Sequence, residues 1–91
     1  MKTLAKQMII ERANKFYSRA KKTMESYKNG NIDIEFAFER EMRYRNQFKG
    51  YLQSMEDLEL ITEREYEDYL DVFFTDVSEI MKDVNLKRFG A

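Results

Sequence analysis

Apolar residues recur along this chain at intervals of three and four, which is the spacing of residues on one face of an α-helix. In the first third of the chain the apolar positions are Ile10, Ala13, Tyr17, Ala20, Met24 and Tyr27, with Ile9 and Phe16 beside them. In the middle they are Ile34, Phe38, Met42, Phe48, Leu52 and Met55, with Tyr44 and Tyr51 along one edge. In the last third they are Tyr66, Leu70, Phe73, Val77, Ile80 and Val84, flanked by Tyr69, Phe74 and Met81. The pattern predicts three long helices, over residues 3–28, 33–58 and 63–86.

The first helix is expected to end just before Gly30, because glycine adopts at low cost the left-handed conformation that terminates helices. Asp33 (or Asn31) then offers a side chain that can accept a hydrogen bond from the first turn of the next helix. Both features lie within a few residues of each other. We therefore expect a short connection between the first and second helices.

The third helix is expected to begin at Thr62, because the sequence from Thr62 to Glu65 matches a capping box. In this motif the threonine hydroxyl accepts from the backbone N–H of the glutamate, and the glutamate carboxylate accepts from the backbone N–H of the threonine. Ile61 and Tyr66 stand at the two positions of a hydrophobic staple. Acidic residues in a first turn are also favoured by the helix dipole. Capping therefore explains the acidic residues at the start of this helix, but not those farther along it.

Short connections between long helices favour antiparallel neighbours. We therefore predict an all-α fold, a single domain over residues 1–91 that forms an up-down-up antiparallel three-helix bundle. Gly50 lies inside the second predicted helix, where glycine costs about 1 kcal/mol relative to alanine. Four helices with a break near Gly50 are the alternative arrangement.

The composition excludes several kinds of chemistry. The 91 residues include no cysteine and no histidine, which removes thiol nucleophiles, disulfides, the commonest zinc ligand and the commonest general base. Motifs for a phosphate-binding glycine loop, a calcium loop or a serine elbow are also missing. We expect no enzyme activity, no catalytic residue, no metal and no cofactor. No apolar run is long enough to cross a membrane, so we expect a soluble, cytoplasmic protein without a membrane partner.

Charge is divided unevenly along the chain, although the net charge is only −1. Residues 1–28 carry eight basic and two acidic side chains, and residues 29–55 carry four of each. Residues 56–91 carry four basic and eleven acidic side chains. The first helix is therefore positive and the third negative. Either these helices neutralise each other within one chain, or their charges remain available to partners.

The acidic side of the third helix is the first candidate contact surface. Five carboxylates on this side are the residues expected to bind a partner protein: Glu67, Asp68, Asp71, Asp76 and Glu79. Such a surface can resemble a phosphate backbone and occupy a nucleic-acid-binding groove on another protein. The simpler interpretation is solubility, together with pairing to the basic first helix.

The second candidate surface is a basic and aromatic group in the middle of the second helix, formed by Arg40, Arg43, Tyr44 and Arg45. Arginine and tyrosine are favoured anchors in protein interfaces. Glu41 and Arg45 are spaced for an ion pair, which would be weak if exposed and costly if buried without further hydrogen bonds. The alternative is that the helix rotates, so that this section faces solvent and Tyr44 packs inside.

The third candidate surface is a basic ridge on the first helix, formed by Arg12, Lys15, Arg19 and Lys22. These residues recur at helical spacing over about 15 Å, so they could follow two or three phosphates of a nucleic-acid backbone. No sequence motif for reading nucleic acid accompanies the ridge. A solvated face that balances an acidic neighbour is the simpler interpretation.

These patterns favour a small, non-enzymatic helical protein that binds another macromolecule. We expect a protein-binding regulator or inhibitor that uses the acidic third helix or the patch on the second, and whose partner could itself bind nucleic acid. Compact acidic proteins of this kind are typical of phage and mobile-element accessory factors. A nucleic-acid-binding module that uses the basic ridge is the first alternative. A structural homo-oligomer is the second, and four apolar residues outside the predicted core positions modestly favour self-association: Leu4, Met8, Phe36 and Val72.

Overall fold

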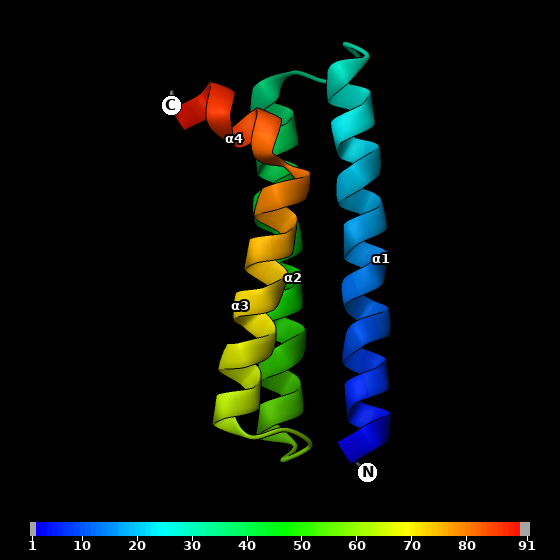
Figure 1. Cartoon of the computed structure of the whole chain (residues 1–91), viewed down its shortest axis with the longest axis vertical. Helices are drawn as coiled ribbons and strands as arrows, with labels where there is room; N and C mark the ends of the chain where they lie inside the picture. Colours follow the sequence, from blue (N-terminus) through cyan, green and yellow to red (C-terminus); the bar gives the residue numbers. More distant parts are fainter. Residues whose placement is uncertain (1, 90–91) are drawn as a thin grey trace.

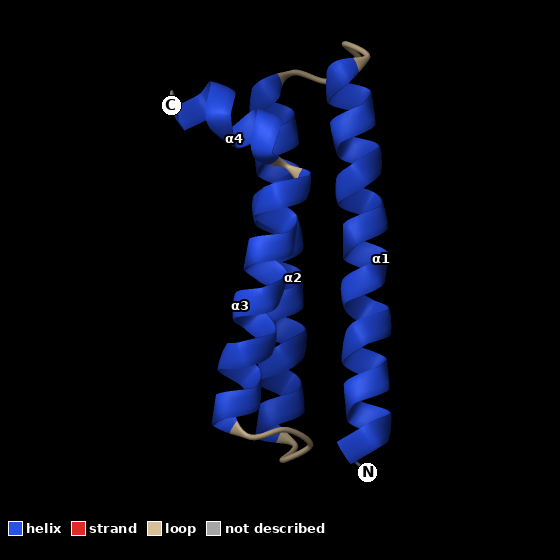
Figure 2. Cartoon of the chain, in the orientation of Figure 1, coloured by secondary structure: helices blue, strands red, loops and turns tan. Residues whose placement is uncertain are grey.

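The computed structural model describes residues 2–89, and these residues form helices joined by short connections, with no strand among them. The helices are α1 (Lys2–Lys28), α2 (Ile34–Asp57), α3 (Glu63–Ile80) and α4 (Lys82–Phe89). The three long helices lie side by side, with α2 running opposite to α1 and α3 (Figure 1). Figure 2 shows how little loop separates them. The all-helical fold predicted from the sequence is confirmed, with a short fourth helix at one end of the long three.

The helix predicted over residues 63–86 is divided at Met81, which separates α3 from α4. The short α4 leaves the axis of α3 and lies beside the start of α2 (Figure 1). This turn buries Val84 in the core. It also brings Arg88 into an ion pair with Glu35 in the first turn of α2. The predicted straight continuation is therefore wrong, because contacts with α2 hold the last helix in a different direction.

Gly50 does not break α2, which runs through it without interruption. The alternative arrangement placed a helix break near Gly50, and this position is wrong, because the fourth helix arises from the break at Met81. Gly50 is exposed, and no atom outside its own helix lies within 4 Å of the place where a Cβ would stand. Neither a kink nor a close approach of another helix requires glycine at this position.

The connection between α1 and α2 uses the local chemistry predicted for it. Gly30 adopts a φ of 78°. Its N–H donates to the Tyr27 carbonyl oxygen at 3.1 Å, and the Asn31 N–H donates to the Ser26 carbonyl oxygen at 2.9 Å. These two bonds form a Schellman motif, which satisfies carbonyl groups that the helix itself leaves unpaired. Asp33 is the N-cap of α2, and its side chain accepts a backbone hydrogen bond from the first turn.

The predicted capping box at the start of α3 is confirmed. The Thr62 hydroxyl accepts from the Glu65 N–H at 3.1 Å, and the Glu65 carboxylate accepts from the Thr62 N–H at 2.9 Å. Ile61 is buried and Tyr66 is half-buried against the same core. The start of α3 is therefore determined by residues within one helical turn of it.

The end of α2 repeats the Schellman motif, but a glutamate stands where α1 has glycine. Glu59 adopts a φ of 60°, a conformation that places Cβ close to the following carbonyl oxygen. Its N–H donates to the Glu56 carbonyl oxygen at 2.8 Å, and the Leu60 N–H donates to the Met55 carbonyl oxygen at 2.9 Å. The hydrogen bonds of the motif thus hold Glu59 in a strained backbone conformation.

We predict that Glu59→Gly raises the free energy of unfolding by about 0.5–1 kcal/mol, because glycine adopts a positive φ without the steric cost. Gln53→Gly is the matched control, since Gln53 is an exposed residue inside α2 where glycine lowers stability by about 1 kcal/mol. Urea denaturation followed by circular dichroism measures both changes. Destabilisation by both substitutions would contradict the assignment of strain to Glu59.

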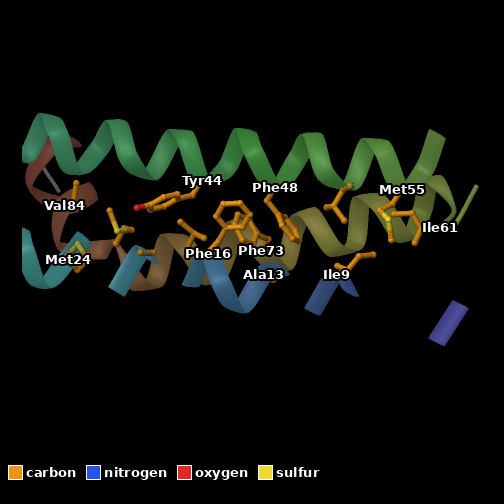
Figure 3. Packing of buried hydrophobic residues seen from close by; sticks show 14 of the residues in the cluster. Ile9, Ala13, Phe16, Met24, Tyr44, Phe48, Met55, Ile61, Phe73 and Val84 are labelled. Carbon is orange, nitrogen blue, oxygen red and sulfur yellow. The ribbon is translucent and has the colours of Figure 1, made fainter. Parts of the chain in front are cut away.

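The centre of the core is formed by three phenylalanines, one from each long helix (Figure 3). The rings of Phe48 and Phe73 are stacked, with their centroids 4.0 Å apart. The ring of Phe16 meets both of them edge-on, at centroid distances of 6.1 Å to Phe48 and 5.9 Å to Phe73. Stacked and edge-to-face aromatic pairs are favourable beyond their buried area. This aromatic centre joins α1, α2 and α3.

The helices α1 and α2 are rotated relative to the orientation predicted from their apolar spacing. In α1 the buried position is Ile9, whereas its neighbour Ile10 is 45% exposed. In α2 Met42 is exposed and Glu41 is buried. The apolar stripe of each helix is wider than the surface that it buries, so packing partners decide which residues face inward. The buried residues of these two helices are Ala5, Ile9, Ala13, Phe16, Ala20, Thr23 and Met24 in α1, and Ala37, Glu41, Tyr44, Phe48, Leu52 and Met55 in α2.

Glu41 is a buried carboxylate that joins three helices. Its Oε2 accepts hydrogen bonds from Arg45 Nη2 at 2.6 Å and Nε at 3.2 Å. The same oxygen accepts from Asn85 Nδ2 of α4 at 3.3 Å, and Arg45 Nη2 also donates to Ser78 Oγ of α3 at 2.7 Å. The sequence left open whether this pair is exposed or buried. It is buried, with side-chain exposures of 1% for Glu41 and 13% for Arg45.

We predict that Arg45→Met lowers the free energy of unfolding by about 3–5 kcal/mol, because it leaves the buried Glu41 carboxylate without its counter-charge. The double variant Glu41→Leu with Arg45→Met should recover most of that loss, since it removes the buried charge as well. Arg43→Met, at an exposed position of the same helix, should change stability by less than about 0.5 kcal/mol. Chemical denaturation measures all three variants. Similar effects of Arg43→Met and Arg45→Met would show that the pair has no structural role.

Candidate functional site

Three of the predicted acidic residues surround a hollow on the outer side of α3. The hollow has a volume of about 460 Å³ and is lined by Glu67, Asp68 and Asp71 together with Leu70 and Phe74. All three carboxylates are exposed, and none of them forms a salt bridge with another residue in the described range 2–89. Because Leu70 and Phe74 are half-buried, the carboxylates stand around an apolar floor. We call this feature the acidic hollow.

The other two predicted acidic residues do not belong to the acidic hollow. Asp76 lies on the side of α3 that faces α1, where its Oδ2 accepts a hydrogen bond from the Tyr17 hydroxyl at 2.8 Å. Burial raises the pKa of Tyr17 above its ordinary value, and the hydrogen bond and the charge of Asp76 raise it further. Glu79 forms an exposed salt bridge with Lys82 at 3.5 Å. The five residues thus form a charged stripe that wraps around α3, and three of them define one place on it.

The predicted basic and aromatic patch on α2 does not form one surface. Tyr44 is turned into the core and its hydroxyl lies 3.0 Å from the Thr23 hydroxyl of α1. Arg45 is engaged by Glu41, and its guanidinium also lies over the Phe74 ring at 4.8 Å. Arg40 and Arg43 alone of the four are exposed. Two of the four predicted residues therefore support the fold, and two remain available to a partner.

The basic ridge of α1 is exposed and lies beside α2, not beside the acidic α3. The guanidinium of Arg12 stacks over the ring of Tyr51 in α2, at 4.7 Å from its centroid. Among residues 2–89, no salt bridge includes Arg12, Lys15, Arg19 or Lys22. The basic ridge and the acidic stripe therefore form no ion pair with each other within the described chain. At the end of α1, Lys28 does pair with Asp83 of α4 at 3.2 Å. The sequence left open whether the predicted first and third helices neutralise each other, and they do so only in part.

A cleft between α1 and α2 brings Arg40 together with the end of the basic ridge. It has a volume of about 180 Å³ and is lined by Arg19, Lys22, Thr23, Ser26, Ile32, Arg40 and Tyr44. Sequence reasoning missed this site because it assigned Arg40 to a separate patch. A signal was present, since Lys22 and Arg40 each lie nine residues from Asn31 in the connection, and an antiparallel pair places such residues opposite each other.

Apolar side chains that the sequence placed outside the core are indeed exposed. Leu4, Met8, Phe36 and Val72 are all at least 41% exposed. Val72 lies with the exposed Ile10 in an apolar hollow of about 290 Å³ between α1 and α3. Nothing on this apolar hollow indicates which molecule would cover it.

The described residues offer neither a metal site nor a membrane span. Within the described residues, no group of three acidic, histidine or cysteine side chains is arranged to hold a metal ion. None of the described helices combines the length and the apolar character that a membrane span requires. What the geometry offers is therefore two charged surfaces of opposite sign, the acidic hollow of α3 and the basic ridge with its cleft.

Comparison with known proteins gives no functional information, because no protein-family model matches the chain and no curated protein or solved structure is detectably similar to it.

Proposed function

We propose that this protein is a non-enzymatic binding protein, a regulator or inhibitor whose acidic hollow receives basic side chains of a partner protein. The observation that carries this proposal is the composition of the hollow. Three carboxylates without a salt bridge in the described chain, Glu67, Asp68 and Asp71, stand around the apolar floor formed by Leu70 and Phe74.

This combination matches the two parts of an arginine or lysine side chain. The long aliphatic stem packs on apolar surface, while the charged head forms charge-assisted hydrogen bonds with carboxylates. Phe74 already packs against a guanidinium inside the chain, since Arg45 Cζ lies 4.8 Å from its ring centroid. A partner with a basic surface would also be attracted over a distance of about 10 Å at an ionic strength of about 0.1 M.

We predict that Asp68→Lys with Asp71→Lys lowers partner capture at least about tenfold, because like charges now face the partner's basic groups. Both residues are exposed, so the helical circular dichroism signal should be unchanged. Glu11→Lys with Glu39→Lys is the matched control, with the same change in net charge at exposed positions on α1 and α2. The measurement is quantitative affinity capture from a nuclease-treated native lysate, with identification of the captured protein. Capture that survives the α3 reversal would reject the acidic hollow as the contact.

A second function, nucleic-acid binding, is favoured by a separate observation. Arg40 of α2 stands across the cleft from Arg19 and Lys22, so cations from two helices border one groove. No carboxylate of the described chain lines that cleft. A single ridge could be a solvated face, but cations on both sides of a groove are suited to a phosphate backbone lying between them.

We predict that labelled DNA and RNA bind with an affinity that falls steeply with salt, and that Arg12→Glu with Arg19→Glu abolishes this binding. Each phosphate contact contributes about −0.7 to the slope of log affinity against log salt for a single strand. The matched control is Lys6→Glu with Lys21→Glu, which reverses two exposed lysines of α1 outside the ridge. Fluorescence anisotropy over a salt series measures the slopes. Equal losses of affinity in the two double variants would show that binding depends only on net charge, and would reject the ridge as the binding site.

A further inference from the structure

One end of the basic ridge meets the cleft between α1 and α2. The ridge runs along α1 from Arg12 to Lys22, and the cleft lies at its Lys22 end. Ile32, which belongs to the connection between α1 and α2, lines the same cleft. Figure 1 shows this connection crossing from one helix to the other at the end of the bundle. A chain of phosphates that follows the ridge toward Lys22 therefore leads into the cleft.

The cleft combines concentrated positive charge with a neutral floor. Thr23 donates its hydroxyl hydrogen to the Arg19 carbonyl oxygen at 2.9 Å. It can therefore only accept from the Tyr44 hydroxyl, which lies 3.0 Å away. Thr23 and Tyr44 are both buried, and their hydroxyl groups are hydrogen-bonded to each other. Lys22 and Arg40, at the mouth of the cleft, are exposed. No carboxylate of the described chain lines the cleft, and no salt bridge there neutralises its three cations.

The two arginines of the cleft are held by rings of their own helices. The Arg19 guanidinium lies 5.3 Å from the Phe16 ring centroid, and the Arg40 guanidinium lies 4.7 Å from that of Phe36. Such a contact orients the planar guanidinium, so that less conformational entropy is lost when a ligand binds. Arginine presents paired N–H groups that match the oxygens of a phosphate.

The size of the cleft restricts the ligand. Sites that enclose a small molecule have volumes of about 300–1,000 Å³, whereas this cleft has about 180 Å³. The cleft can therefore hold a single phosphate group, but it is too small to enclose a whole nucleotide. Three cations around one phosphate also favour the terminal monoester, which carries about −1.5 to −2 charges at pH 7, over a backbone diester with one.

We propose that the cleft between α1 and α2 binds the terminal phosphate of a single nucleic-acid strand, while the strand's backbone continues along the basic ridge. This inference rests on the second function proposed above. Arg19, Lys22 and Arg40 contact the terminal phosphate, and Lys15 and Arg12 meet the next phosphates along the strand. The protein thereby distinguishes a phosphorylated end from a hydroxyl end or an internal segment.

The test compares labelled single strands of one sequence that carry a 5′-phosphate, a 3′-phosphate or neither. One phosphorylated strand should bind about tenfold more tightly than the unphosphorylated strand at pH 7.5, through the added charge-assisted hydrogen bonds. This preference should shrink at about pH 5.5, because a monoester loses a charge below its second pKa of about 6. The chain contains no histidine, so no side chain with an ordinary pKa titrates between these values.

Variants assign the preference to the cleft. Arg40→Gln should remove the preference for the phosphorylated end, and it should weaken the unphosphorylated strand no more than Arg12→Gln does, since each change removes one phosphate contact. Arg43→Gln, an exposed arginine one turn farther along α2 that does not line the cleft, should keep the preference. Arg12→Gln should weaken binding of all three strands equally, because Arg12 contacts the phosphate backbone that the strands share. A preference that survives Arg40→Gln would overturn the proposal.

The remaining outcomes distinguish failure of the terminal-phosphate site from failure of nucleic-acid binding itself. Equal binding of all three strands would overturn the phosphate site and leave nucleic-acid binding standing. Failure of every strand to bind would overturn both. Inorganic phosphate or a mononucleotide that competes as tightly as the phosphorylated strand would identify the ligand as a free phosphate and would overturn recognition of a strand end.

Discussion

The contact among Phe16, Phe48 and Phe73 is the interaction on which the rest of the structure depends. Each long helix contributes one ring, and the three rings meet within 4.0–6.1 Å of one another. Since side chains project from a helix at fixed angles, placing one ring inward sets the direction of every other residue on that helix. The positions of the charged surfaces are therefore consequences of aromatic packing.

This constraint explains why the charges of α1 and α3 stay apart. With Phe16 directed inward, the basic ridge borders α2, where Arg12 stacks over Tyr51. The side of α1 that faces α3 instead carries Tyr17, which binds Asp76. A net charge of −1 thus conceals two surfaces of opposite sign. One is the basic ridge with its cleft between α1 and α2, and the other is the acidic hollow on α3.

The buried Glu41 provides a second constraint, which acts on α4. Its carboxylate holds Arg45 in α2 and Asn85 in α4, and Arg45 reaches Ser78 in α3. A charge in this position is stable only with its partners in place, so the network favours one orientation of the last helix. It also withdraws Arg45 from the surface. For this reason the residues expected to form one patch on α2 do not lie on one surface. Arg40 instead lines the cleft between α1 and α2.

The sequence by itself determined the helical fold, the C-terminal end of α1 and the start of α3, because capping and turn formation depend on residues within one helical turn. Gly30 and Thr62 could be interpreted without knowledge of any packing partner. The choice of Ile9 over Ile10, the turn at Met81 and the meeting of Arg40 with Lys22 were decided only by the tertiary structure. In each case the local pattern allows more than one arrangement, since apolar spacing continues through Val84 and the stripe on α1 is wide. Contacts between residues distant in sequence select one arrangement, and a single sequence does not show which residues will meet.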